Sequence, residues 1–224
     1  MYYKLDGFDP FFEKALLRNE YKKENNFFIK SFQLPIPYGE KIIKNYKKYA
    51  EAMFFEETGY KQIKWQEGLN QLASIAKKSG IDWWTTGNIL LPLNGIEADI
   101  NDVDFIFNEK DVGAVYDAFQ DHIVEPIIYG GSKADTYKYN GMAYTGCAVC
   151  MFAGVHESID IPEITHFGKY AEANLLEYEW NGYKIKAPPI ELYIKTLERW
   201  GKTERAQYIK NAIQHKYSKT TLKY

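Results

Sequence analysis

A heptapeptide that begins at residue 101, Asn-Asp-Val-Asp-Phe-Ile-Phe, constrains the fold more than any other part of the sequence. Successive side chains of a β-strand point to opposite faces. One face of this segment takes Val103, Phe105 and Phe107. The other face takes Asp102 and Asp104. The segment therefore predicts a strand that is buried on one side and holds two neighbouring carboxylates on the other.

The two carboxylates indicate a metal site. Neighbouring anions repel each other unless a cation lies between them, so Asp102 and Asp104 suit a divalent ion with hard oxygen ligands. The alternative is an edge strand whose aspartates face solvent. Asp is a poor strand former, which makes two of them in successive outward positions unusual. Both interpretations are open on this segment alone.

A glycine turn lies one strand upstream of the aspartates. Residues 81–86 are typical of a strand, which leads into Gly87 and Asn88 and then into an apolar stretch that begins at Ile89. In a strand, glycine turn and helix start, backbone N–H groups can receive phosphate oxygens. The turn and the aspartate pair together predict a site for a metal and a phosphorylated ligand.

These motifs resemble the minimal bacterial nucleotidyltransferases of the polymerase-β-like superfamily, in which a strand and a Gly-Gly or Gly-Ser turn precede Asp-x-Asp. Here thirteen residues separate Gly87-Asn88 from Asp102-Val103-Asp104. Residues 98–104 resemble the antibiotic nucleotidyltransferases and the related AbiEii-type toxin enzymes. Residues 181–195 resemble the last strand and following helix of the family. The resemblance covers about residues 80–215.

The resemblance implies an enzyme that transfers a nucleoside monophosphate from a nucleoside triphosphate to a hydroxyl acceptor. ATP, GTP and CTP are all open as donors, and the acceptor is a small molecule or RNA. Asp102 and Asp104 would hold Mg²⁺ or Mn²⁺ and act in catalysis. Gly87, Asn88 and Lys195 would bind the triphosphate.

One element of the family pattern is missing. The family carries a third carboxylate on a neighbouring strand, but the segment expected to align there, residues 147–152, contains no acid. The nearest candidates are Glu157 and Asp160. We expect Asp160 to be the third catalytic acid, because flanking isoleucines predict an extended stretch that turns it away from the core. The alternative is a catalytically weakened protein that binds a nucleotide or a partner.

Periodicity and resemblance together predict an α/β (α+β) fold with a small mixed sheet of nucleotidyltransferase-like topology and C-terminal helices. The expected parts are a helical N-terminal region at 1–79, the nucleotidyltransferase-like domain at 80–215 and a polar tail at 216–224. Within the first region, one helix is expected from Pro10 to about Lys23. Asn-Gly at 140–141 and Thr-Gly at 145–146 are expected to break a hairpin or meander.

The amino-acid composition limits the classes of partner that the chain is expected to bind. The 28 Lys and Arg against 30 Asp and Glu disfavour binding to nucleic acid by bulk charge, and no DNA partner is expected. Basic helices between residues 195 and 210 support an RNA acceptor, whereas the 17% aromatic content fits a small acceptor better. No apolar run has the length of a membrane span, and the first residues do not form a secretory signal.

The cysteine content points to a reducing compartment. The chain has two cysteines, Cys147 and Cys150, which excludes a disulfide scaffold and makes the cytoplasm the expected location. Their Cys-x-x-Cys spacing falls on a predicted strand, not at a helix start, and a zinc site would need a second ligand pair. Both are therefore expected to be buried core residues.

Overall fold

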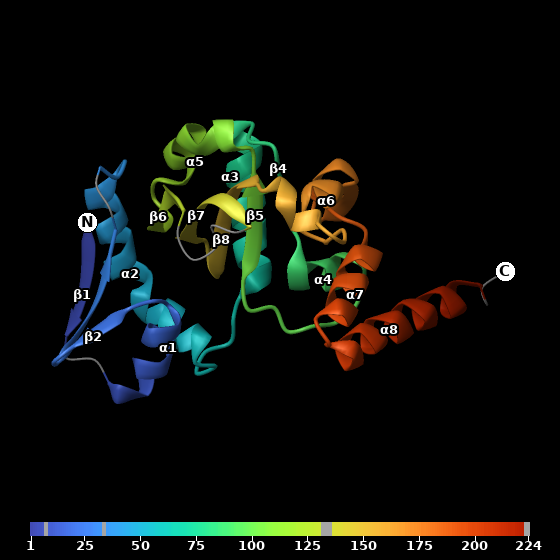
Figure 1. The fold of residues 1–224 in the computed structure, drawn as a ribbon, viewed down its shortest axis with the longest axis horizontal. Coiled ribbons are helices and arrows are strands. Elements are labelled where there is room, and N and C mark those ends of the chain that lie inside the picture. Colours follow the sequence, from blue (N-terminus) through green and yellow to red (C-terminus); the bar gives the residue numbers. More distant parts are fainter. Residues whose placement is uncertain (7–8, 33–34, 131–135, 222–224) are drawn as a thin grey trace.

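A seven-stranded mixed sheet forms the centre of the molecule, with a small three-stranded sheet at one end of its long axis and helix α8 at the other (Figure 1). The computed structural model describes residues 1–6, 9–32, 35–130 and 136–221. In spatial order the large sheet consists of β6 (Ile123–Tyr129), β7 (Tyr137–Tyr144), β8 (Ala148–Val155), β5 (Val103–Phe107), β4 (Trp83–Trp84), β10 (Tyr183–Ala187) and β9 (Leu176–Trp180). The small sheet consists of β1 (Tyr2–Asp6), β3 (Phe27–Ser31) and β2 (Lys22–Glu24).

Helices follow or separate these strands. The α-helices are α1 (Glu13–Arg18), α2 (Gly39–Glu57), α3 (Trp65–Ser79), α4 (Leu90–Leu93), α5 (Val112–Phe119), α6 (Lys169–Ala173), α7 (Ile190–Arg199) and α8 (Thr203–Thr221). Short 3₁₀ helices are η1 (Pro10–Phe12), η2 (Gly87–Ile89), η3 (Glu109–Asp111) and η4 (Glu157–Asp160). The predicted α/β class with a mixed sheet is confirmed. Among the described residues, no helix combines the length and the apolar character that crossing a bilayer requires.

Strand β5 lies in the middle of the sheet and is buried on both faces along most of its length. It pairs in parallel with β8 and antiparallel with β4. Phe105 and Phe107 belong to the hydrophobic cluster that includes residues of α3 and α5. Ile106, on the opposite face, is buried in a second cluster with Trp84 and Phe152. The second face is therefore closed around Ile106, and Asp104 is only half-buried on it.

The prediction that the N-terminal region is purely helical was wrong, because this region contains β1, β2 and β3. The helix expected to continue to Lys23 ends at Arg18, and Glu20 adopts a positive φ of 65° before the chain enters β2. Strand β3 is the middle strand and pairs antiparallel with both β1 and β2. The pairing of β1 with β3 joins segments about 25 residues apart, so local helical periodicity could not indicate it.

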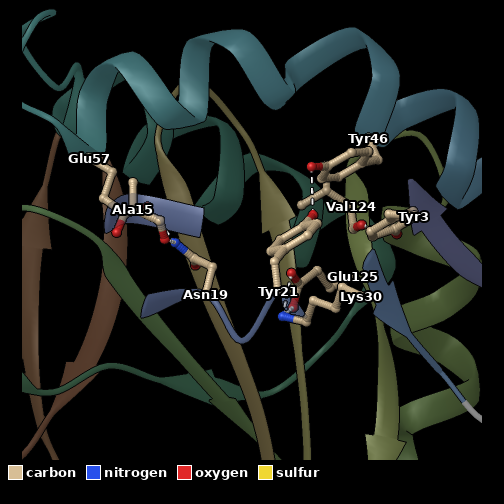
Figure 2. Close-up of polar contacts among 9 residues, drawn as sticks. All are labelled: Tyr3, Ala15, Asn19, Tyr21, Lys30, Tyr46, Glu57, Val124 and Glu125. Atoms are coloured by element: carbon tan, nitrogen blue, oxygen red, sulfur yellow. Dashed lines mark hydrogen bonds and ion pairs between the residues drawn. The ribbon is translucent and has the colours of Figure 1, made fainter. Parts of the chain in front are cut away.

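Figure 2 shows polar contacts that join the N-terminal region to α2 and to the large sheet. The Tyr3 hydroxyl donates to the Val124 carbonyl in β6, and the Tyr21 hydroxyl donates to that of Tyr46 over 2.5 Å. Lys30 Nζ lies 2.7 Å from Glu125 Oε1, and each of these side chains is only 13% exposed. Burial raises the pKa of Glu125, and the Lys30 ammonium opposes that increase. The N-terminal strands also share one hydrophobic cluster with β5 and β8.

Two turn predictions had different outcomes. Gly146, with φ of 102°, lies in the turn between β7 and β8, as expected. The break expected at Asn140-Gly141 was wrong, because β7 continues through these residues. A Cβ at Gly141 would lie 2.8 Å from the Ile127 Cα on the irregular neighbouring strand β6. The glycine therefore permits a close approach of two strands instead of a turn.

The C-terminal part follows the sequence closely until its end. Strand β10 and helix α7 lie where they were expected. The tail expected from residue 216 is helical instead, since α8 extends to Thr221, and residues 222–224 lie outside the described residues. Lys216 Nζ donates a hydrogen bond to the Asn94 carbonyl, which joins this part of α8 to the end of α4.

Candidate active site

The parallel pairing of β5 with β8 assembles a cluster of three side chains. The register places Asp104 opposite Cys150, and Asp102 directly precedes β5. One ligand atom from each of Asp102, Asp104 and Cys150 lies within 4.8 Å of the others. The Cys150 Sγ is 3.4 Å from the Asp102 Oδ2. The structure thus brings the two predicted aspartates together and adds a thiol to them.

The predicted glycine turn lies against one of these carboxylates. Gly87 has φ of 69°, a conformation that residues with a Cβ rarely adopt. A Cβ built at Gly87 would lie 3.1 Å from the Asp104 Oδ2. The turn residues belong to η2, which is followed only by the four-residue α4, so no long helix begins at the turn. Any contact of this turn with a phosphate would therefore come from the backbone of the turn itself.

The side chain of Asn88 connects the turn to the C-terminal helices. Its Oδ1 accepts hydrogen bonds from the Tyr193 hydroxyl at 2.6 Å and from Arg205 Nη2 at 2.9 Å. Burial raises the pKa of Tyr193, and the charge of Arg205 opposes this, so the hydroxyl stays protonated at neutral pH. The role of Arg205 as the cation beside the turn could not be singled out from the sequence, because it is one of several basic residues between 195 and 210.

Lys195 does not lie with these groups. It is exposed on α7 two residues beyond Tyr193, and two residues along a helix turn a side chain to a different side. Lys195 lines a surface depression with Glu198 and Lys210 instead. The assignment of Lys195 to the triphosphate therefore stays a prediction, whereas Arg205 has a contact to the turn.

Asp160 is engaged in a local hydrogen-bond network and is not a member of the cluster. Its Oδ1 accepts hydrogen bonds from the backbone N–H and the hydroxyl of Thr165, at 2.8 and 3.0 Å, and its Oδ2 accepts one from the N–H of Tyr170 at 2.7 Å. Gly168 packs directly on this carboxylate. Glu157, the other candidate, is exposed in η4. Among the described residues, neither acid belongs to the group that could hold a metal.

We expect Asp160→Asn to lower stability and to leave metal binding unchanged. The amide would present an NH₂ to the Tyr170 N–H, so one charge-assisted hydrogen bond would be lost at a cost of about 2 kcal/mol. Urea unfolding measures the cost, and calorimetric titration with a divalent ion measures binding. A large loss of metal affinity with unchanged stability would instead restore Asp160 to the site.

A buried histidine supports the strand that leads into the turn. The Thr86 hydroxyl donates to the His166 carbonyl at 2.7 Å. Burial, with a smaller effect of Arg199, lowers the pKa of His166 to about 3, so the imidazole is neutral at physiological pH. Its Nδ1 has no hydrogen-bond partner in the described part of the chain. His166 is therefore a neutral, buried side chain that packs in this region and adds no charge to it.

The two cysteines differ in their environments. Cys147 is fully buried, as predicted, and burial raises the pKa of its thiol to about 12. The prediction of a core position was wrong for Cys150, which is only partly buried and faces Asp102. Strand alternation carried the signal: Val149 and Met151 point into the core, so Cys150 must point to the face of the aspartates.

A cavity of about 490 Å³ begins at Cys150 and extends to the small N-terminal sheet. Strand register explains its floor, because Cys150 lies opposite Met142 and Met142 lies opposite Glu125. These residues continue the row that starts at Asp104 on β5. From the N-terminal region, Lys22, Glu24 and Ile29 to Phe32 contribute to the other wall. The N-terminal region thus borders the same face of the sheet that carries the metal-binding candidates.

The chain is structurally similar to two nucleotidyltransferase-related structures. TM1012 of Thermotoga maritima, a proposed nucleotidyltransferase, has a TM-score of 0.47 and 15% identity, and the match covers 66% of this chain and 91% of that one. ANT(2″)-Ia, in complex with adenylyl-2″-tobramycin, has a TM-score of 0.41 and 10% identity, over 66% of this chain and 96% of that one. No protein-family model matches the sequence, and no curated protein matches it.

Proposed function

We propose that the protein is a metal-dependent nucleotidyltransferase that moves a nucleoside monophosphate from a nucleoside triphosphate to a hydroxyl of a small molecule. The observation that carries this proposal is the position of Gly87 directly above Asp104. A Cβ at Gly87 would lie 3.1 Å from the carboxylate oxygen. A backbone turn without a side chain, placed against one of the paired carboxylates, would let a metal-bound triphosphate contact the N–H groups of the turn without obstruction by a Cβ.

The donor set supports a divalent cation. Asp102 and Asp104 supply hard oxygen ligands of the kind that Mg²⁺ and Mn²⁺ prefer, and their ligand atoms are within 4.8 Å of each other. A cation held there would neutralise charge on the triphosphate and favour ionisation of the acceptor hydroxyl. Gly87 would position the phosphates through the backbone, and Arg205 would supply positive charge beside Asn88. Lys195 would assist only if the side chain reached around α7.

The proposed reaction is a single displacement. The acceptor oxygen forms a bond to the α-phosphorus while the bond from that phosphorus to the oxygen bridging to the β-phosphate breaks. Pyrophosphate leaves, and the hydroxyl proton passes to water. Such a step depends mainly on positioning and electrostatics, so a site with two carboxylates can support it at a reduced rate.

The size of the cavity beside the aspartates favours a small acceptor over RNA. Its volume of about 490 Å³ is typical of small-molecule sites, and it starts at Cys150 beside the aspartates. Its lining carries charges of both signs, including the partly buried pair of Lys30 and Glu125. An acceptor with several polar groups would fit such a lining. We also place the protein in the cytoplasm, where the two free thiols stay reduced.

The second candidate is a protein that binds the nucleotide without turnover, and the absence of a third acid from the cluster Asp102, Asp104 and Cys150 favours it. Titration calorimetry with Mg²⁺ and each of ATP, GTP, CTP and UTP tests binding. Pyrophosphate release in the presence of a panel of hydroxylated compounds tests turnover. Binding without pyrophosphate release would favour the second candidate, and no binding of any triphosphate would contradict both.

A further inference from the structure

The side chain that stands beside the two aspartates is a thiol, and this affects which metal the site prefers. Cys150 lies on β8 opposite Asp104 of β5, the position where a third ligand from a neighbouring strand would reach the same ion. Resting on the proposed function, we propose that this site binds a thiophilic divalent cation of the Zn²⁺ type through Asp102, Asp104 and Cys150, and that Cys150 shifts its preference away from Mg²⁺.

The first argument is the chemistry of the donor set. Mg²⁺ takes oxygen ligands in near-octahedral geometry and does not use sulfur. Thiolate ligands favour Zn²⁺ and related ions instead. With Mg²⁺ bound to the aspartates, Cys150 would contribute no ligand although its Sγ lies 3.4 Å from the Asp102 Oδ2. A thiophilic ion uses all three groups.

The second argument is distance. In tetrahedral coordination, a Zn–S bond of about 2.3 Å and a Zn–O bond of about 2.1 Å place the sulfur and oxygen ligands roughly 3.6 Å apart. The observed distance between Cys150 Sγ and Asp102 Oδ2, 3.4 Å, is close to that spacing. The third ligand atom, from Asp104, lies within 4.8 Å of both. Small side-chain adjustments therefore suffice to bring all three atoms to one ion.

The third argument is access. Cys150 and Asp104 are half-buried and Asp102 is exposed, so the cluster is open to ions from solvent. Three protein ligands leave the fourth tetrahedral position for water or a phosphate oxygen, as in catalytic zinc sites. Binding through sulfur would release the proton that Cys150 now donates to Asp102. Cys147, in contrast, is fully buried and has no place in the cluster.

Cobalt provides a spectroscopic test that does not depend on activity. Titration of the full chain with Co²⁺ under a phosphine reductant should produce a sulfur-to-cobalt charge-transfer band in the near ultraviolet. Cys150→Ser should abolish that band and weaken Zn²⁺ binding, measured by competition with Co²⁺, by at least about tenfold, since loss of groups outside the ligand shell already costs as much. Cys147→Ser is the matched control and should keep both the band and the affinity.

Two further variants complete the test. Asp102→Asn should weaken Zn²⁺ binding like Cys150→Ser, because one ion contacts both residues. Cys150→Asp should lose the band and bind Mg²⁺ more tightly than the wild type does. The proposal is overturned if Co²⁺ gives no sulfur band, or if Cys150→Ser or Asp102→Asn leaves Zn²⁺ affinity unchanged. A sulfur band without binding of any triphosphate would support this site while contradicting the proposed function. Triphosphate binding with Mg²⁺ and no sulfur band would do the reverse.

Discussion

Replacing both aspartates, Asp102→Asn with Asp104→Asn, should abolish stabilisation of the protein by Mg²⁺ and a nucleoside triphosphate. A ligand at a hundred times its Kd stabilises by about 2.7 kcal/mol, which raises the Tm of a chain of this size by roughly 5–10 °C. The carboxylates would be the oxygen ligands that the cation requires, so this increase should disappear. Pyrophosphate release should fall by at least about 10³-fold, or about 4 kcal/mol in activation free energy.

The double variant should fold normally. Two carboxylates with ligand atoms within 4.8 Å repel each other without a cation, so their removal should leave the Tm of the metal-free protein unchanged or slightly higher. Asp99→Asn with Asp111→Asn is a control that removes the same charge from residues outside the cluster. An unchanged thermal shift in the variant at 102 and 104, or an equal loss in the control, would refute the site.

Elements defined by local pattern could be predicted from the sequence. The alternation around Val103 and Asp104 correctly placed a buried face on β5 and both carboxylates on the other side, although Ile106 is buried on that second side as well. The position of Gly87 followed from the strand before it and the apolar stretch after it. Both depend on neighbouring residues, whose geometry the backbone fixes over a few positions.

Features that depend on pairing of distant segments could not be predicted in the same way. The Cys150 thiol meets Asp102 only because β5 and β8 pair in parallel with a particular register. Arg205 reaches Asn88 across 117 positions of sequence. The pairing of β1 with β3 likewise joins distant segments. The purely helical expectation for that region was wrong because strand formation depends on tertiary context more than on local propensity.

Gly87→Val should weaken triphosphate binding by roughly 100-fold, equivalent to about 2.7 kcal/mol. A Cβ at this position would already lie 3.1 Å from the Asp104 Oδ2, and the two methyl groups of valine add bulk around that Cβ. The carboxylate would have to move away from the position in which it shares an ion with Asp102. Titration calorimetry with Mg²⁺ and the preferred triphosphate measures the loss.

Gly80 provides a control that separates the effect of backbone strain from the effect on the geometry of the site. Gly80 has φ of 66°, nearly the same as the 69° of Gly87, but a Cβ there would meet no atom within 4 Å. Gly80→Val should therefore suffer a similar backbone cost of about 1–2 kcal/mol in stability and bind the triphosphate normally. If both variants lose binding to the same extent, the effect comes from destabilisation of the fold. A loss confined to Gly87→Val would show that binding depends on the arrangement of the turn and Asp104, because the two substitutions differ chiefly in what the new side chain meets.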